Sequence, residues 1–130
     1  MKLLMVEDDD QSRELSCRLI THEFAYLTIL QADDGKSGLD LFREHFPDIV
    51  ISDITMPGMD GIALAAKIKA LRPETKIILL TAHSDKRRLS VSMELGINDY
   101  IVKPIDFKAL TTAIQACLDE IGHEVRRGHR

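Results

Sequence analysis

Five short apolar runs, each followed by a longer segment of helical periodicity, are the feature that most restricts the fold of this chain. The five runs are Leu3–Val6, Tyr26–Leu30, Ile49–Ile51, Ile77–Leu80 and Tyr100–Val102. Four of them are rich in β-branched or large aliphatic residues with little polar alternation, which is typical of strands buried on both faces. The second run contains an internal threonine, so we expect it at an edge of the sheet.

In the segments between and after these runs, apolar residues recur every three or four positions, as on one face of a helix. These stripes are Leu15, Leu19 and Ile20; Leu39, Phe42 and Phe46; Ile62, Ala65, Ile68 and Leu71; Leu89 and Met93; and Phe107, Leu110, Ile114, Cys117, Leu118 and Ile121. Capping and helix-breaking residues set the predicted boundaries. They are Asp10 and Asp106 as N-caps, and Pro47, Pro73, Gly96 and Gly122 as stops.

Strict alternation of strand and helix predicts an α/β fold of (βα)5 type, a doubly wound five-stranded parallel sheet with helices on both faces. The 130 residues suit a single domain. In such a sheet, ligands bind at the carboxyl ends of the strands, beside the point where the strand order reverses.

Composition narrows the class of protein. The net charge is −4, so the domain as a whole has no general attraction for nucleic acid, and we expect the basic clusters at 86–88 and 126–130 to be solvated. No apolar run approaches the ~20 residues of a membrane-spanning helix, and the N-terminal run is too short for a signal peptide, so we expect a cytoplasmic protein. Cys17 and Cys117 form no C-x-x-C pair and are predicted to be reduced thiols.

Polar residues with useful chemistry follow four of the five runs. Glu7 and Asp8 follow the first run, Asp53 the third, Thr81 the fourth and Lys103 the fifth. The carboxyl ends of parallel strands meet at one edge of the sheet. We therefore expect three carboxylates, a hydroxyl and an ammonium group to converge there.

The charge of such a cluster predicts a bound cation. Two carboxylates about 4 Å apart repel by about 4 kcal/mol at an effective dielectric constant of about 20. Lys103 supplies one positive charge, and a divalent ion is the natural second. Oxygen ligands without histidine or cysteine favour a hard cation, here Mg²⁺ with Mn²⁺ as a possible substitute. A metal beside a carboxylate, a lysine and a threonine suits phosphoryl transfer, with Asp53 as the nucleophile.

Four segments resemble the response-regulator receiver domains of two-component signalling. They are Val6–Asp9, Ser52–Gly61, Leu80–Ala82 and Asp99–Pro104, which occur in the order and at the intervals of that family. The resemblance implies the strand order 2-1-3-4-5 and a receiver domain over residues 1–121. Residues 122–130 are then a basic tail or the start of a linker.

The resemblance also implies roles at the metal and phosphoacceptor site. Asp53 would be the aspartyl-phosphate site. Asp8, Asp53 and the backbone carbonyl of Thr55 would bind Mg²⁺ directly, and Glu7 would act through bound water. Glu7 stands where the family often has aspartate. Lys103 would pair with Asp53 and then with a phosphoryl oxygen.

A second group of implied roles concerns switching. Thr81 and the adjacent Ala82 would contact the phosphoryl group, and Tyr100 would turn inward as Thr81 moves. The Lys103–Pro104 bond is expected to be cis. Thr55 and His83 flank the phosphoryl position and would govern the access of hydrolytic water and hence the lifetime of the phosphate.

The expected phosphodonor is a histidine kinase or a histidine phosphotransfer protein, and the domain would catalyse only its own phosphorylation and dephosphorylation. The face built from the fourth helix, fifth strand and fifth helix would change shape and serve a homodimer or an output domain. No membrane contact and no direct nucleic-acid binding are expected. The cognate kinase, the output and the oligomeric state stay open, as does whether the chain is a stand-alone receiver.

Three other functions compete with this interpretation. A phosphatase of the haloacid dehalogenase type needs a second aspartate two residues after its nucleophile, where this chain has Thr55. A flavodoxin-like flavin binder needs a hydroxyl- and glycine-rich phosphate cradle after the first strand, where this chain has four consecutive acidic residues, 7–10. A non-phosphorylated pseudo-receiver that acts as a protein-interaction scaffold stays open.

Overall fold

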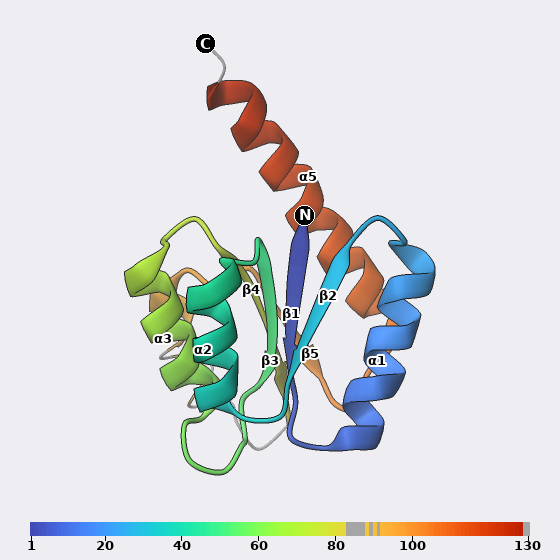
Figure 1. Ribbon diagram of the computed structural model, residues 1–130, viewed down its shortest axis with the longest axis vertical. Helices are drawn as coiled ribbons and strands as arrows, with labels where there is room; N and C mark the ends of the chain where they lie inside the picture. The colour runs from blue at the N-terminus through green and yellow to red at the C-terminus, as the bar shows by residue number, and fades with distance from the viewer. Residues whose placement is uncertain (83–87, 89, 91, 129–130) are drawn as a thin grey trace.

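The computed structural model describes residues 1–82, 88, 90 and 92–128. A parallel sheet of five strands runs through the middle of the molecule (Figure 1). The strands are β1 (Lys2–Val6), β2 (Thr28–Ala32), β3 (Ile49–Asp53), β4 (Lys76–Thr81) and β5 (Asp99–Val102). Their order in the sheet is β2-β1-β3-β4-β5, which confirms the predicted α/β topology.

Helices cover both faces of the sheet, as predicted. The described α-helices are α1 (Asp10–Glu23), α2 (Gly35–His45), α3 (Gly61–Leu71) and α5 (Phe107–Gly128). In Figure 1, α2 and α3 lie together on one side, and α1 and α5 lie on the other. A short 3-10 helix, η2 (Met93–Leu95), precedes β5 and ends at Gly96, whose φ of 78° makes glycine suitable there.

The fourth predicted helix falls mostly on residues that the structure leaves undescribed. Its stripe residue Leu89 lies outside the described residues, and Met93 is exposed. Arg88, Ser90 and Ser92 are helical. The described part of the chain thus contains four α-helices where the sequence predicts five.

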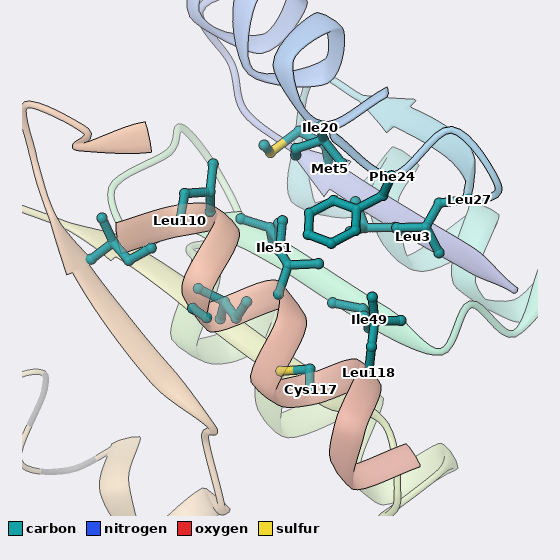
Figure 2. Packing of buried hydrophobic residues seen from close by; sticks show 14 of the residues in the cluster. Leu3, Met5, Ile20, Phe24, Leu27, Ile49, Ile51, Leu110, Cys117 and Leu118 are labelled. Atoms are coloured by element: carbon teal, nitrogen blue, oxygen red, sulfur yellow. The ribbon is translucent and has the colours of Figure 1, made fainter. Parts of the chain in front are cut away.

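Two apolar cores, one on each side of the sheet, hold the layers together. Successive side chains of a strand point to opposite faces, so Leu3 and Met5 enter one core while Leu4 and Val6 enter the other. Figure 2 shows the first core, in which Leu110, Cys117 and Leu118 of α5 face residues of β1, β3 and α1. Every residue of β3 and β4 is buried, as expected for central strands of a parallel sheet.

Two predicted boundaries in the first third of the chain are wrong. β2 begins at Thr28 rather than Tyr26, because pairing with β1 starts at Lys2 opposite Thr28 and leaves the tyrosine exposed. The N-cap of α1 is Asp9, whose carboxylate accepts a hydrogen bond from the Ser12 N–H.

Three apolar residues of the predicted stripes do not enter the core. Leu15 is exposed, and α1 instead buries Ser16, Cys17 and Ile20. Phe46 is the C-cap of α2 with a left-handed φ of 45°, which turns it away from the stripe, and Leu71 is exposed at the last turn of α3. Cys17 and Cys117 are both free and buried, as predicted for reduced thiols.

The predicted stop of the last helix at Gly122 is also wrong, since α5 continues to Gly128 and projects beyond the body of the molecule (Figure 1). Glycine inside a helix costs only about 1 kcal/mol. Lys76, at the start of β4, forms ion pairs with Glu120 and Glu124 of α5. These contacts support the helix on both sides of Gly122. None of the described helices is both long enough and apolar enough for a membrane span.

Candidate functional site

The carboxyl ends of β1, β3, β4 and β5 bring the predicted residues to one edge of the sheet. The register places Val6 beside Ser52, Asp53 beside Leu80, and Thr81 beside Val102. The residues at or after these ends therefore meet, although up to 96 positions separate them in the chain. Glu7, Asp53 and Thr81 are all buried, with exposed fractions of 3%, 6% and 0%.

The loop between β1 and α1 divides four consecutive carboxylates between two tasks. Glu7 and Asp8 lie at the site, whereas Asp9 caps α1 and Asp10 forms an ion pair with Arg13 at 2.7 Å. Carboxylates near a helix N-terminus are stabilised by the helix dipole. Two of the four carboxylates thus stabilise the start of α1, and the other two lie at the site.

Oxygens of Glu7, Asp8 and Asp53 all lie within 4.8 Å of one another. The Lys103 ammonium donates a hydrogen bond to Asp53 Oδ2, and its Nζ lies 3.5 Å from Glu7 Oε2. Three carboxylates therefore face one ammonium group. The excess of negative charge is the electrostatic condition under which a divalent cation binds.

The pKa of Glu7 is raised from 4.5 to about 7, mainly by burial and further by the hydrogen bond and charge of Asp53, against the opposing charge of Lys103. Burial disfavours the charged form of Lys103, but the hydrogen bond and charge of Asp53 outweigh it, so the pKa of the ammonium is raised. The negative charge of Asp53 thus contributes to raising the pKa of both groups.

The residues present fit a hard divalent ion. Glu7 Oε2 is buried and has no hydrogen-bond partner within the described part of the chain. A buried carboxylate oxygen without a hydrogen bond is costly unless a cation or an ordered water satisfies it, and the Lys103 ammonium at 3.5 Å is shared with Asp53. The donor atoms that come together are carboxylate oxygens, which Mg²⁺ and Mn²⁺ prefer.

The remaining predicted residues lie in or after β3, β4 and β5. Thr55 is exposed two positions after Asp53, and Thr81 Oγ1 donates to the Ala82 carbonyl oxygen at 3.1 Å. The Tyr100 hydroxyl lies 3.1 Å from Ser92 Oγ, and the peptide bond between Lys103 and Pro104 is cis. The predicted lifetime-tuning residue His83 lies outside the described residues.

Close packing supports the loop after β3. A Cβ at Gly61 would lie 2.2 Å from the Asp53 carbonyl oxygen, so only glycine fits there. Asp60 caps α3 through the Ala63 N–H and forms an ion pair with Arg88. The backbone that carries Asp53 is thereby held against the start of α3.

A cavity of about 280 Å³ opens beside the carboxylates. Glu7 and Lys103 line its polar side, and Met5, Leu15 and Phe107 are among its apolar walls. Of the three carboxylates, only Glu7 borders this cavity, which lies between α1 and the start of α5.

Sequence reasoning missed two polar residues, Arg13, which bonds the Glu7 carbonyl, and Ser92, which contacts Tyr100. The spacing of Asp10 and Arg13 is a signal for their ion pair, since residues three apart on a helix are neighbours. The contact of Ser92 with Tyr100 has no comparable signal, because a helical segment and a strand bring the two together.

Comparison with known proteins identifies the family. The sequence-family model described as the response regulator receiver domain matches residues 3–115. The chain belongs to this family. Receiver domains of this kind are parts of two-component systems, so the resemblance stated from the four motifs is confirmed.

Curated relatives of this receiver domain include regulators of about twice its length. The chain is 38% identical over 131 residues to the transcriptional regulatory protein AfsQ1 of Streptomyces coelicolor, covering 98% of the chain and 52% of the relative. It is 36% identical over 121 residues to the transcriptional regulatory protein CseB of Streptomyces avermitilis, covering 93% and 50%. The chain thus spans about half the length of these relatives.

One relative is matched over its whole length. Protein CcdB of Bacillus subtilis is 34% identical over 123 residues, which cover 95% of this chain and 100% of CcdB. Among solved structures, a CheY-like response regulator receiver domain protein of Methanospirillum hungatei superposes with a TM-score of 0.87 at 28% identity, covering 95% of this chain and 97% of that one. A receiver domain protein of Clostridium thermocellum gives 0.86 at 28%, covering 93% and 96%.

Proposed function

We propose that this receiver domain accepts a phosphoryl group on Asp53 from a histidine kinase or a histidine phosphotransfer protein, in a reaction that requires Mg²⁺. One observation carries the proposal, namely the convergence of three carboxylates and Lys103 at the carboxyl edge of the sheet. The family supports the same chemistry.

In this proposal Asp8, Asp53 and the Thr55 backbone carbonyl hold the ion, and Glu7 contacts it through water. The bound ion neutralises negative charge on the transferring phosphoryl group. Mn²⁺ is expected to substitute, because it accepts the same oxygen donors. Glu7 Oε2, which is buried and has no hydrogen bond among the described residues, would be satisfied by the water that the ion holds.

Asp53 acts as the nucleophile. A carboxylate oxygen of Asp53 forms a bond to phosphorus while the phosphorus–nitrogen bond of the donor phosphohistidine breaks, and the electron pair stays on the imidazole nitrogen. Lys103, which now bonds Asp53 Oδ2, exchanges that oxygen for a phosphoryl oxygen.

After transfer, Thr81 and Tyr100 convert the added charge into a change of shape. Thr81 exchanges its bond to the Ala82 carbonyl for one to the phosphoryl group, and Tyr100 turns inward into the vacated space. The face built from the predicted fourth helix, β5 and α5 is altered and recruits a second copy or an output domain. Only contacts that differ between two states can shift their balance. Thr55 and His83 set the rate of hydrolysis.

Intact-mass measurement tests the proposed function. Incubation with Mg²⁺ and acetyl phosphate is expected to add the mass of one phosphoryl group. The adduct should be absent with EDTA and in Asp53→Asn, whereas the exposed Asp33→Asn variant should still be labelled. An adduct that persists in Asp53→Asn would overturn the assignment. Wild-type protein that never acquires one would instead support a pseudo-receiver that acts as a scaffold.

A further inference from the structure

We propose that Arg13 is a positioning residue for the metal site, which holds the acidic loop of residues 7–10 in the shape that binds the divalent ion. This inference rests on the proposed function. Arg13 lies on the first turn of α1, and its side chain is 14% exposed. Arg13 lies outside the four segments that carry the resemblance to receiver domains.

The guanidinium group connects three elements. Nη1 donates to the backbone carbonyl of Glu7 at 2.8 Å, Nη2 donates to Asp10 Oδ1 at 2.7 Å, and Nε donates to Gln31 Oε1 at 3.3 Å. These acceptors lie directly after β1, at the start of α1 and near the end of β2. A planar fork with donors in fixed directions can satisfy all three at once, which a lysine cannot.

These contacts fix the backbone on both sides of Asp8. Glu7 is held by its N–H, which donates to the Ala32 carbonyl at 3.1 Å, and by its carbonyl, which accepts from Arg13. Asp9 is held by its capping bond to Ser12 and by its carbonyl, which accepts the Arg13 N–H at 2.9 Å. Asp8 itself is exposed and faces the cluster from between two anchored neighbours. Among these bonds, the one from the Arg13 side chain to the Glu7 carbonyl is the side-chain contact that ties the peptide before Asp8 to α1.

Charge and geometry act in opposite directions at this residue. Removal of a positive charge near three carboxylates strengthens the attraction for a cation, whereas loss of the fork releases the loop and weakens binding. Arg13→Lys retains the charge and removes the planar fork, so it isolates the geometric effect. Arg18→Lys is the matched control, since Arg18 lies on the same helix and is exposed.

Calorimetric titration with Mg²⁺ alone tests the inference. We expect Arg13→Lys to bind Mg²⁺ about tenfold more weakly than wild type, as for other residues that orient metal ligands. Arg18→Lys should match wild type. Gln31→Leu removes an exposed acceptor without touching the helix and should weaken binding in the same direction by a smaller factor.

Two further readouts separate positioning from a general structural role. The amide resonance of Asp8 should shift in Arg13→Lys while those of the α5 core stay in place. Labelling by acetyl phosphate should return to the wild-type rate at saturating Mg²⁺, because Arg13 acts only on the ion's site. Wild-type Mg²⁺ affinity in Arg13→Lys would overturn this inference alone. A wild-type protein that binds no Mg²⁺ would overturn the proposed function as well.

Discussion

Glu7 is a carboxylate that the fold keeps almost completely from water, with its side chain 4% exposed. Its Oε2 lies 3.5 Å from Lys103, which is also bonded to Asp53. A single ammonium group thus serves two buried carboxylates. This arrangement costs stability in the metal-free protein, and that cost is measurable.

The first prediction concerns the pH dependence of metal-free stability. Because the pKa of Glu7 is raised from 4.5 to about 7, the folded protein keeps a proton over this range that the unfolded chain releases. The unfolded state binds fewer protons there, so the free energy of unfolding falls as the pH rises from 4.5 to 7. The fall attributable to Glu7 is at most about 3 kcal/mol.

Urea denaturation in EDTA across this pH range measures the effect. Glu7→Gln should flatten the fall, and the exposed Glu14→Gln should leave it unchanged. A Glu7→Gln protein with the same slope as wild type would show that this carboxylate does not carry the shift.

Sequence motifs identify the residues of the site but not the contacts that hold them. Asp53 and Lys103 could be predicted from their places after the third and fifth apolar runs. The assignment of the α1 cap to Asp9 rather than Asp10 could not, because adjacent aspartates are equally good caps in a sequence pattern. The contacts of Arg13 with Glu7 and Gln31 depend on the spacing of three elements in space.

At the level of elements, α5 shows how tertiary contacts override a local signal. Gly122 predicts a helix end, yet the helix runs on because Lys76 binds two glutamates one turn apart. The Asn98 side chain adds a hydrogen bond to Glu120 at 3.1 Å and accepts the Ile77 N–H at 2.9 Å. The sequence around Lys76 does not indicate which acidic residues this buried lysine will contact in the folded protein.

Lys76→Met is therefore expected to loosen the end of α5. The loss of both ion pairs should accelerate amide hydrogen exchange in residues 119–125 while the turns that contain Leu110 and Ile114 stay protected. The exposed Lys67→Met serves as the control. Unchanged exchange in residues 119–125 would mean that these pairs do not support the extension.

β5 and α5 also belong to the proposed switch. Thr81→Ala should still be phosphorylated, because Asp53 and Lys103 remain, but it loses the hydroxyl that couples the phosphoryl group to β5. Amide chemical-shift changes on phosphorylation should therefore shrink in β5 and α5. Thr28→Ala, at an exposed position of β2, should respond as wild type does. Full-sized changes in Thr81→Ala would contradict the coupling.

For the whole molecule, the doubly wound parallel sheet was predictable because apolar runs and helical stripes alternate along the sequence, whereas the strand order was implied by the resemblance to receiver domains. Parallel strands need crossover helices, and right-handed crossovers leave few arrangements. The division of the core into two clusters follows from the alternation of side chains along β1. The exposure of Leu15 and Phe46 was not predictable, since their periodicity is that of buried residues and only the packed layers decide which turn is covered.

The central claim is that the carboxyl edge of the sheet forms one phosphoacceptor site at Asp53. Identifying the phosphorylated residue tests this claim most directly. Protein treated with acetyl phosphate and Mg²⁺ is reduced with borohydride, whose hydride attacks the acyl carbon as the phosphate leaves. Peptide mass spectrometry then locates the new alcohol. We predict homoserine at position 53 alone, formed only when Mg²⁺ is present. Homoserine at Asp8 or Asp60, or an unaltered Asp53 in labelled protein, would contradict the proposed site.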